Sequence, residues 1–143
     1  MYGSMYGNTE AMMNAVTQGI SDEGVPVNIF DVAHTHVSYV LPSLWTRRGV
    51  MVGAPTYEGS LFPLVDQALE SASHKKIHNK LAARFGSYGW SGGAGRRFGQ
   101  LVEQMDWEMF GEFEFVGAAT RADFEAGKAF GARFARAVRG ETD

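Results

Sequence analysis

The sequence predicts an α/β domain built on a doubly wound parallel sheet with helices on both faces. Helical and strand patterns alternate along the chain, without internal repeats or linkers. Such alternation is typical of strand–helix–strand units, whose strands run parallel. The chain has 143 residues, about the size of one ordinary domain and enough to bury a core. We therefore expect one domain over residues 1–143.

The helices are predicted from apolar residues three and four positions apart. The first, over residues 9–22, stops before Gly24 and Pro26, which are typical of helix ends. Pro42 weakens or kinks the second. The predicted helices cover residues 9–22, 37–45, 61–72, 96–105 and 122–138. In the third, the stripe expected to be buried consists of Leu61, Leu64, Val65, Ala68, Leu69 and Ala72.

The strands are predicted from short apolar runs between these helices. Residues 49–53 fit a short buried strand. Residues 112–118 alternate phenylalanine and glycine with other residues, which fits an edge strand with one wet face. The predicted strands cover residues 25–32, 49–53, 81–88 and 112–118.

Composition excludes several classes of function. The formal net charge is −3 and the basic residues are scattered, so neither nucleic acid nor a membrane is an expected partner. No spanning apolar run or signal peptide is evident, which makes the cytoplasm the expected location. The chain has no cysteine, which excludes disulfides, thiolate nucleophiles and iron–sulfur clusters. Redox chemistry would therefore need an organic cofactor, or histidine and carboxylate ligands.

Three segments that follow predicted strands carry chemical information, because ligands of open α/β sheets bind at the carboxyl ends of strands. The first, residues 4–9, runs into the first helix. The hydroxyls of Ser4 and Thr9 and the amide of Asn8 offer hydrogen bonds to a phosphate dianion. The N–H groups at the helix start add positive potential. An ordinary helix cap with a glycine turn is the alternative.

The second and third segments combine glycines with aromatic side chains. Residues 53–59 place Tyr57 between two glycines, and residues 86–95 hold several glycines together with Tyr88 and Trp90. Glycines let the backbone approach a ligand closely, and aromatic faces stack on flat heterocycles. A phosphate loop joined to two such loops suits a flat, phosphorylated cofactor.

With these motifs the chain resembles flavodoxin-like FMN domains, most closely the C-terminal flavodoxin domain of flavodiiron proteins (A-type flavoproteins). The resemblance covers nearly the whole chain. It rests on Tyr-Gly-Ser-Met-Tyr-Gly-Asn-Thr-Glu at 2–10, Thr-His-Val-Ser-Tyr at 35–39, Pro-Thr-Tyr at 55–57 with Leu-Phe-Pro at 61–63, and Gly-Ser-Tyr-Gly-Trp-Ser-Gly-Gly-Ala at 86–94.

The resemblance implies FMN as the cofactor and assigns residues to it. The phosphate would be held by Ser4, Met5, Tyr6, Gly7, Asn8 and Thr9. One side of the isoalloxazine ring would be flanked by Pro55, Thr56, Tyr57, Glu58 and Gly59. The other side would be flanked by Ser87, Tyr88, Gly89, Trp90, Gly92 and Gly93. No catalytic residue and no metal ligand is expected.

The resemblance also implies the strand order 2-1-3-4-5, in which the first strand lies inside the sheet. Only Met1 and Tyr2 remain of that strand, so we expect unpaired backbone edges on both of its neighbours. A start site placed late, a fragment of a longer flavodiiron-type protein, or residues missing from the sequence would each explain this.

The implied function is electron transfer. In flavodiiron proteins the FMN domain follows a diiron domain that reduces dioxygen or nitric oxide, and no part of that domain is present in this sequence. The partners implied are a rubredoxin-like protein or an NAD(P)H-dependent reductase as donor, and a second copy in a homodimer. Two alternatives stay open: a stand-alone FMN-dependent NAD(P)H:quinone reductase, and a cofactor-free interaction module.

Other polar residues are interpreted as structural or surface groups. His34 and His36 resemble a metal pair but have no carboxylate partner at ligand spacing. Asp31 stands where a nicotinamide-binding fold places its ribose acid, but no glycine fingerprint precedes it. Arg96 and Arg97 lie at a helix start, where the dipole opposes positive charge, so a docking or flavin-edge role is an alternative to simple exposure.

Overall fold

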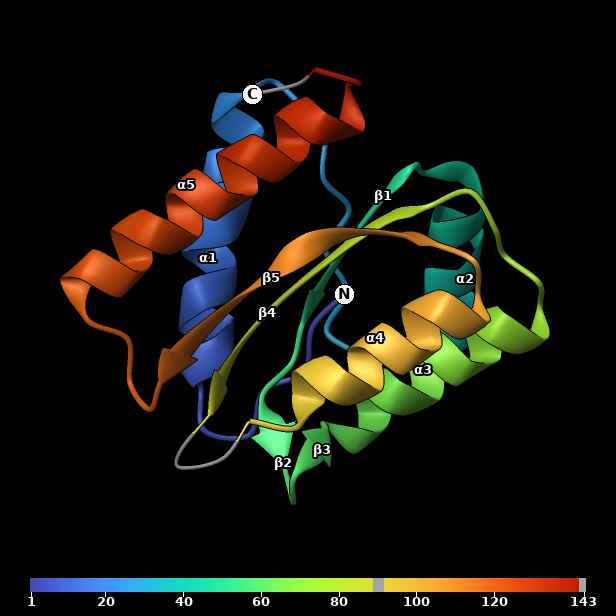
Figure 1. Ribbon diagram of the computed structural model, residues 1–143, viewed down its shortest axis with the longest axis horizontal. Helices are drawn as coiled ribbons and strands as arrows, with labels where there is room; N and C mark the ends of the chain where they lie inside the picture. The colour runs from blue at the N-terminus through green and yellow to red at the C-terminus, as the bar shows by residue number, and fades with distance from the viewer. Residues whose placement is uncertain (89–91, 142–143) are drawn as a thin grey trace.

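A parallel sheet lies between two layers of helices (Figure 1). The computed structural model describes residues 1–88 and 92–141. The elements are α1 Asn8–Asp22, α2 Val37–Thr46, β1 Gly49–Gly53, β2 Thr56–Tyr57, β3 Ser60–Leu61, α3 Pro63–His74, β4 Leu81–Tyr88, α4 Ala94–Gln104, β5 Glu108–Val116 and α5 Arg121–Val138. The α/β class predicted from the sequence is confirmed.

Strand β4 is the centre of the sheet. It pairs in parallel with β1 on one side, where Gly49 lies opposite Leu81, and with β5 on the other, where Glu108 lies opposite Leu81. The pairing with β5 shifts register between Ala82 and Ala83. β4 is buried over six successive residues, as expected of a strand covered by helices on both faces.

The first strand is reduced to a single bridging residue, Tyr2. Tyr2 forms parallel bridges to Asp31 on one side and to Gly53 on the other. Its N–H donates to the Phe30 carbonyl at 2.9 Å, and the Gly53 N–H donates to the Met1 carbonyl at 2.9 Å. The order across the sheet is therefore the predicted 2-1-3-4-5, with the first two positions filled by short segments.

The predicted strand over residues 25–32 is wrong in extent. Among the described residues of this segment, only Asp31 takes part in a bridge, and no strand is formed. A strand needs a partner for its N–H and C=O groups. The partner here consists of Met1 and Tyr2 alone, so residues 25–29 have nothing beside them to pair with.

The helices form one layer on each face of the sheet. α1 and α5 cover one face, while α2, α3 and α4 cover the other (Figure 1). The first layer buries Met12, Val16, Phe85, Phe130 and Phe134. The second buries Val52, Val65, Leu69, Phe98 and Leu101. None of the described helices is long and apolar enough to span a bilayer.

Three further details differ from the sequence predictions. β5 begins at Glu108, four residues before the predicted start at 112. Its early residues pair with β4 but lack the alternation of apolar and polar residues from which the rest of the strand was predicted. Leu64, placed in the buried stripe of α3, is 40% exposed. The short β2–β3 hairpin after β1 was not expected at all.

The crossing of α1 and α5 depends on two glycines. A Cβ on Gly19 would lie 1.9 Å from the Lys128 carbonyl oxygen, and one on Gly131 would lie 2.2 Å from the Val16 carbonyl oxygen. The two helix backbones therefore touch, which only glycine permits.

We expect Gly19→Ala to lower the free energy of unfolding by about 2 kcal/mol, because overpacking outweighs the gain in helix propensity. Gly99→Ala in α4 is the matched control, since nothing lies within 4 Å of its added Cβ. The control should raise stability by about 0.5–1 kcal/mol. Urea unfolding of both variants is the measurement, and equal stabilities would contradict the close crossing.

Burial lowers the pKa of the Met1 amino group from 8.0 to about 6. Between these values the unfolded chain binds more protons than the folded one, so the free energy of unfolding should rise from pH 6 to pH 8, by about 2 kcal/mol. N-terminal acetylation removes this ionisable group and no other. Urea unfolding of the free and the acetylated chain at pH 6 and pH 8 measures the change in the free energy of unfolding. The same change in both forms would contradict the effect assigned to the Met1 amino group.

Candidate cofactor-binding site

Three loops meet at the carboxyl end of the sheet, at the bottom of Figure 1. The first two are joined where the Gly3 N–H donates to the Gly53 carbonyl at 2.9 Å. The second and third touch through backbone, since a Cβ on Gly93 would lie 1.8 Å from the Gly59 carbonyl oxygen. The segments singled out in the sequence are thus brought together in space.

The first loop, residues 4–7, turns sharply into α1. Gly7 has a left-handed φ of 85° and occupies the N-cap of α1, where no side chain caps the helix. The Gly7 N–H donates to Ser4 Oγ at 3.0 Å, which closes the turn. Met5 and Tyr6 are exposed, Tyr6 to 85%. The uncapped first turn of α1 leaves N–H groups available to an anion.

Thr9 is the clearest sign of a missing ligand in this loop. Its side chain is 1% exposed, and Thr9 Oγ1 has no hydrogen-bond partner among the described residues. A buried hydroxyl without a partner costs about 1–3 kcal/mol, so such groups in native proteins need an explanation. A phosphate oxygen at the α1 N-terminus would accept a hydrogen bond from the Thr9 hydroxyl. The loop therefore fits a phosphate group.

The second loop contains the β2–β3 hairpin. Glu58 and Gly59 occupy its tip with φ of 48° and 75°, which is the left-handed pair of a type I′ turn. Glu58 is a non-glycine residue in this region, a form of strain that collects at functional sites. Tyr57 is half-buried, and its ring meets that of Phe62 edge-on at 6.4 Å. Pro55, just before the hairpin, is buried.

The third loop follows β4 and leads into α4. Ser87 and Tyr88 end the strand half-buried, Gly92 is exposed and Gly93 is buried. Thr56 Oγ1 accepts from the N–H groups of Gly93 and Ala94, at 3.5 and 3.4 Å, and so caps α4 from the second loop. Thr56 therefore ties the two loops together. Gly89 and Trp90, both predicted to flank the ring, lie outside the described residues.

Arg84 is a residue that the sequence reasoning missed. It is 0% exposed in the middle of β4, and its Nη1 donates to the Ala54 carbonyl at 3.0 Å. Its Nε donates to Glu112 at 2.7 Å, and its Nη2 donates to Glu114. The available signal was an arginine in an apolar strand followed by a strand with glutamates at alternate positions.

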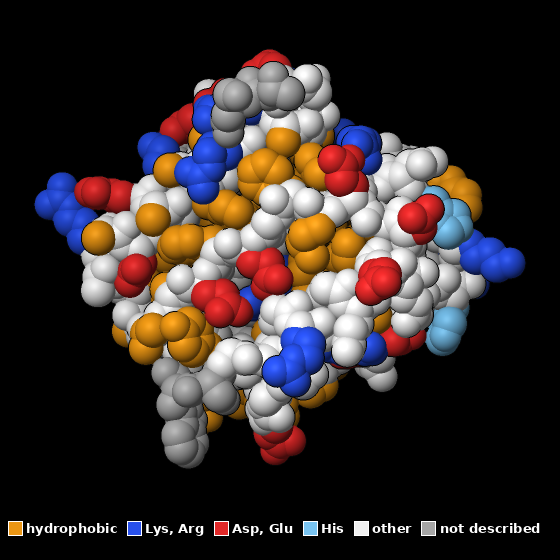
Figure 2. Space-filling model, in the orientation of Figure 1, with side chains coloured by type: hydrophobic (Ala, Val, Ile, Leu, Met, Phe, Trp, Pro, Cys, Tyr) orange, Lys and Arg blue, Asp and Glu red, His pale blue; other side chains and the backbone are white. Residues whose placement is uncertain are grey.

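The charge around the loops is negative. None of their described residues is Lys or Arg, and the single charge of Arg84 faces two carboxylates. Glu114 lies next to the third loop and Glu112 next to the start of α4, since a Cβ on Gly92 would lie 3.4 Å from Glu114 Oε2 and one on Gly95 would lie 2.7 Å from Glu112 Oε2. Acidic side chains accordingly gather over β5 in Figure 2. A cofactor here would experience a potential that resists additional negative charge.

The other polar residues have structural contacts. His36 Nδ1 accepts from the Ser38 N–H at 3.2 Å and caps α2, while His34 pairs with Asp31 at 2.7 Å. Arg97 lies between α3 and α4, where it pairs with Asp66 at 2.7 Å and Glu70 at 2.6 Å. These carboxylates raise the pKa of Arg97. In the described structure Arg97 therefore joins two helices.

Comparison with known proteins decides the family, because the family model for flavodoxin matches residues 1–141. The chain belongs to the flavodoxin family. FMN is the cofactor of this family, as the sequence predicted. Open α/β sheets generally bind their ligands at the carboxyl ends of the strands, which is where these three loops lie.

Among curated relatives, the anaerobic nitric oxide reductase flavorubredoxin of Salmonella typhi is 36% identical over 110 residues, covering 76% of this chain and 23% of the relative. The flavorubredoxin of Escherichia coli O1:K1 is 35% identical over 111 residues. The chain thus spans about a quarter of the length of these relatives. It is related to the flavodoxin domain of flavodiiron proteins.

Solved structures of known proteins share the fold of this chain. The rubredoxin oxygen:oxidoreductase of the anaerobe Desulfovibrio gigas matches with a TM-score of 0.91 and 28% identity, over 97% of this chain and 35% of that one. A flavodoxin from the domain Archaea matches with a TM-score of 0.81 and 24% identity, over 97% of this chain and 99% of that one. The second likeness is one of fold alone.

Thr9→Val tests the phosphate site. The change removes a buried hydroxyl and keeps the shape, so the cofactor-free protein should be as stable as the parent or more so. Its affinity for FMN should fall about 10-fold or more, since a hydrogen bond to a charged group is lost. Riboflavin has no phosphate, so its affinity should not change. Flavin fluorescence titrations measure both.

Thr9→Ser is the matched control, because it keeps the hydroxyl and should bind FMN nearly as the parent does. If Thr9→Val weakened FMN and riboflavin equally, the hydroxyl would not face the phosphate.

Proposed function

We propose that this chain is an FMN-binding electron-transfer domain. The observation that carries the proposal is the buried hydroxyl of Thr9 at the uncapped start of α1, which has no partner among the described residues. The second and third loops, in backbone contact with each other, lie at the same end of the sheet. FMN supplies one- and two-electron chemistry when bound.

Different residues would bind different parts of FMN. Ser4, Met5, Tyr6, Gly7, Asn8 and Thr9 would hold the phosphate through hydroxyl and backbone N–H groups. Pro55, Thr56, Tyr57, Glu58 and Gly59 would flank one side of the ring, with Tyr57 as its aromatic contact. Ser87, Tyr88, Gly92 and Gly93, with Gly89 and Trp90, would flank the other side.

The relatives suggest what this domain exchanges electrons with. Their names describe a nitric oxide reductase flavorubredoxin and a rubredoxin oxygen:oxidoreductase. We propose that a rubredoxin-like protein or an NAD(P)H-dependent reductase donates electrons to the flavin of this domain. A diiron domain that reduces dioxygen or nitric oxide would receive them. We propose a cytoplasmic location and a homodimer, the assembly implied by the resemblance.

The FMN-loaded domain should accept electrons from a chemically reduced rubredoxin and should not oxidise NADH or NADPH by itself. Stopped-flow absorbance of the flavin measures the first, and NAD(P)H absorbance in the presence of a quinone measures the second. Sustained NAD(P)H:quinone turnover would instead indicate a stand-alone reductase. Failure to bind FMN would favour a cofactor-free interaction module.

Tyr57→Ala separates ring binding from phosphate binding. The loss of an aromatic contact, worth about 0.5–1.5 kcal/mol, should weaken FMN and riboflavin alike by roughly 3- to 10-fold. Tyr39→Ala is a matched control, since Tyr39 is a 71% exposed tyrosine on α2. Equal effects of the two substitutions would contradict the placing of the ring.

A further inference from the structure

Arg84 is a charged side chain in the interior of the sheet. It is 0% exposed and lies in the middle of β4, opposite Glu112 of β5. Its neighbours on the same face of the strand are Ala82 and Gly86, because alternate residues of a strand share a face. Ala82 packs into the layer formed by α2, α3 and α4, and a Cβ on Gly86 would lie 3.0 Å from Arg84 Nη1. The guanidinium therefore lies between the sheet and this helix layer, where small neighbours leave it room.

One donor of the guanidinium reaches the start of the second loop. Arg84 Nη1 donates to the Ala54 carbonyl at 3.0 Å, and Ala54 directly precedes Pro55 and the β2–β3 hairpin. Among the described residues, no other group donates to this carbonyl. The Ala54 N–H is bonded to the Phe85 carbonyl at 2.9 Å. Both backbone groups of Ala54 are thus held by β4, and the carbonyl is held only through Arg84.

The other two donors reach carboxylates beside the third loop. Arg84 Nε donates to Glu112 at 2.7 Å, and Nη2 donates to Glu114. Glu114 lies next to Gly92 of the third loop, and Glu112 lies next to Gly95 in the first turn of α4. The guanidinium is planar and presents its donors in a fixed geometry. One rigid group is therefore bonded to the start of the second loop and to the neighbours of the third.

Stability alone does not explain a buried arginine at this position. Dehydrating its charge is costly, and well-packed apolar residues in place of a buried ion pair are often equally or more stabilising. The residue opposite Arg84 on β1 is Val52, which is fully buried, so an apolar side chain suits this part of the sheet. An apolar residue in place of Arg84 would supply no donor to the Ala54 carbonyl and no bond to the carboxylates of β5. These bonds are the specific contribution of Arg84.

We propose that Arg84 is a positioning residue for the isoalloxazine ring of FMN, an inference that rests on the proposed function. Arg84 holds the second loop through the Ala54 carbonyl and the third loop through Glu114, which fixes one loop relative to the other. None of these bonds involves residues 4–9, the phosphate loop. Arg84 should therefore control the affinity for the flavin ring and leave the contribution of the phosphate unchanged.

The first experiment uses the cofactor-free chain, so that it does not depend on flavin binding. Arg84→Met keeps an unbranched side chain and removes all three bonds. In amide NMR spectra of this variant, the signals of Tyr57 in the second loop and Gly93 in the third should shift, while those of residues 7–9 should stay in place. Unchanged Tyr57 and Gly93 signals in the folded variant would overturn the proposal.

Flavin affinity is the second measurement. Arg84→Met should weaken FMN and riboflavin alike by about 3- to 10-fold, as expected when the aromatic contact of the second loop is displaced. Arg84→Lys should also bind both flavins more weakly than the parent, because lysine keeps the charge but not the planar set of donors. Full affinity of Arg84→Lys would show that the charge and not the geometry matters, and would overturn the proposal.

A double-mutant cycle identifies the loop through which Arg84 acts. Tyr57→Ala already removes the ring contact that Arg84 would position, so Arg84→Met should weaken flavin binding by a smaller factor in that background than in the parent. In the Thr9→Val background its effect on FMN should be as large as in the parent, because the phosphate site is independent. Equal factors in the Tyr57→Ala background and the parent would overturn the proposal.

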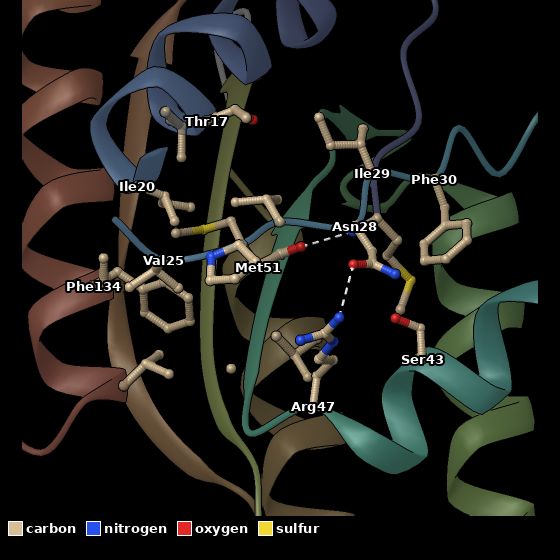
Figure 3. Close-up of a pocket in the computed structure, with 18 of the residues that line it drawn as sticks. Thr17, Ile20, Val25, Asn28, Ile29, Phe30, Ser43, Arg47, Met51 and Phe134 are labelled. Carbon is tan, nitrogen blue, oxygen red and sulfur yellow. Dashed lines mark hydrogen bonds between the residues drawn. The ribbon is translucent and has the colours of Figure 1, made fainter. Parts of the chain in front are cut away.

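Two other arginines provide controls for the loss of an arginine as such. Arg97→Met breaks the ion pairs with Asp66 and Glu70 between α3 and α4. Arg47→Met removes the bond from Arg47 Nη2 to Asn28 Oδ1 at 3.3 Å, beside a cavity between residues 25–30 and β1 (Figure 3). The bonding partners of both side chains lie outside the three loops, so both variants should bind flavins as the parent does. Equal weakening by all three substitutions would reduce Arg84 to a general structural role and overturn the proposal.

Arg84→Met leaves two carboxylates without their cation, so a variant free of that defect is also needed. Arg84→Met combined with Glu112→Gln and Glu114→Gln removes all three charges, and thermal melting shows that it is folded. It should weaken both flavins as Arg84→Met does, because it too lacks a donor to the Ala54 carbonyl. Parent-like affinity of this triple variant would overturn the proposal. If the parent itself bound neither flavin, the proposed function would fail instead, and the NMR comparison would still test the effect of Arg84 on the loops.

Discussion

The arrangement of the two loops proposed to flank the flavin depends on one buried cation, Arg84. An arginine at the centre of a sheet costs several kcal/mol to dehydrate unless its donors are satisfied. Here the guanidinium bonds to the Ala54 carbonyl, to Glu112 and to Glu114. The central strand is thereby linked to the start of the second loop and to the edge strand. Because the two carboxylates are partly exposed, with side-chain exposures of 30% and 31%, the interaction also keeps the surface near the third loop acidic.

Glycines provide the other constraint on the site. Gly93 touches the Gly59 carbonyl, and Gly86 similarly meets the Ala54 carbonyl, which would lie 1.8 Å from an added Cβ. The second and third loops are therefore in backbone contact, and Thr56 adds a hydrogen-bonded link to α4. Contacts of this kind leave little room for either loop to shift on its own. A ligand bound at these loops would meet a largely preformed surface, as small-molecule sites commonly provide.

Much of the fold could be predicted from local sequence patterns, whereas the predictions that were wrong or missing concern how the strands pair. β1 and β4 have the predicted bounds, because apolar runs between glycines and polar turns mark a buried strand. Residues 25–32 have the same apolar character yet form no strand, since strand formation also requires a neighbour that only Met1 and Tyr2 provide. Arg84 was missed for a related reason. Its role depends on which residues of β5 lie beside it, and register across a parallel sheet cannot be read from either strand alone. The loop motifs could be found from the sequence because the glycines, hydroxyl side chains and aromatic rings within each loop indicate ligand binding, whatever the pairing of the strands.

The shortened first strand does not leave the phosphate loop unsupported. Gly3 is bonded to the Gly53 carbonyl, and Tyr2 to Phe30 and Val32, immediately before the loop begins. The Tyr2 side chain adds a tertiary contact, because its hydroxyl donates to Glu10 on α1 at 3.1 Å. Burial, with this bond, raises the pKa of Tyr2 to about 12, so the hydroxyl keeps its proton and remains a donor. The loop is therefore held from β1, from residues 30–32 and from α1.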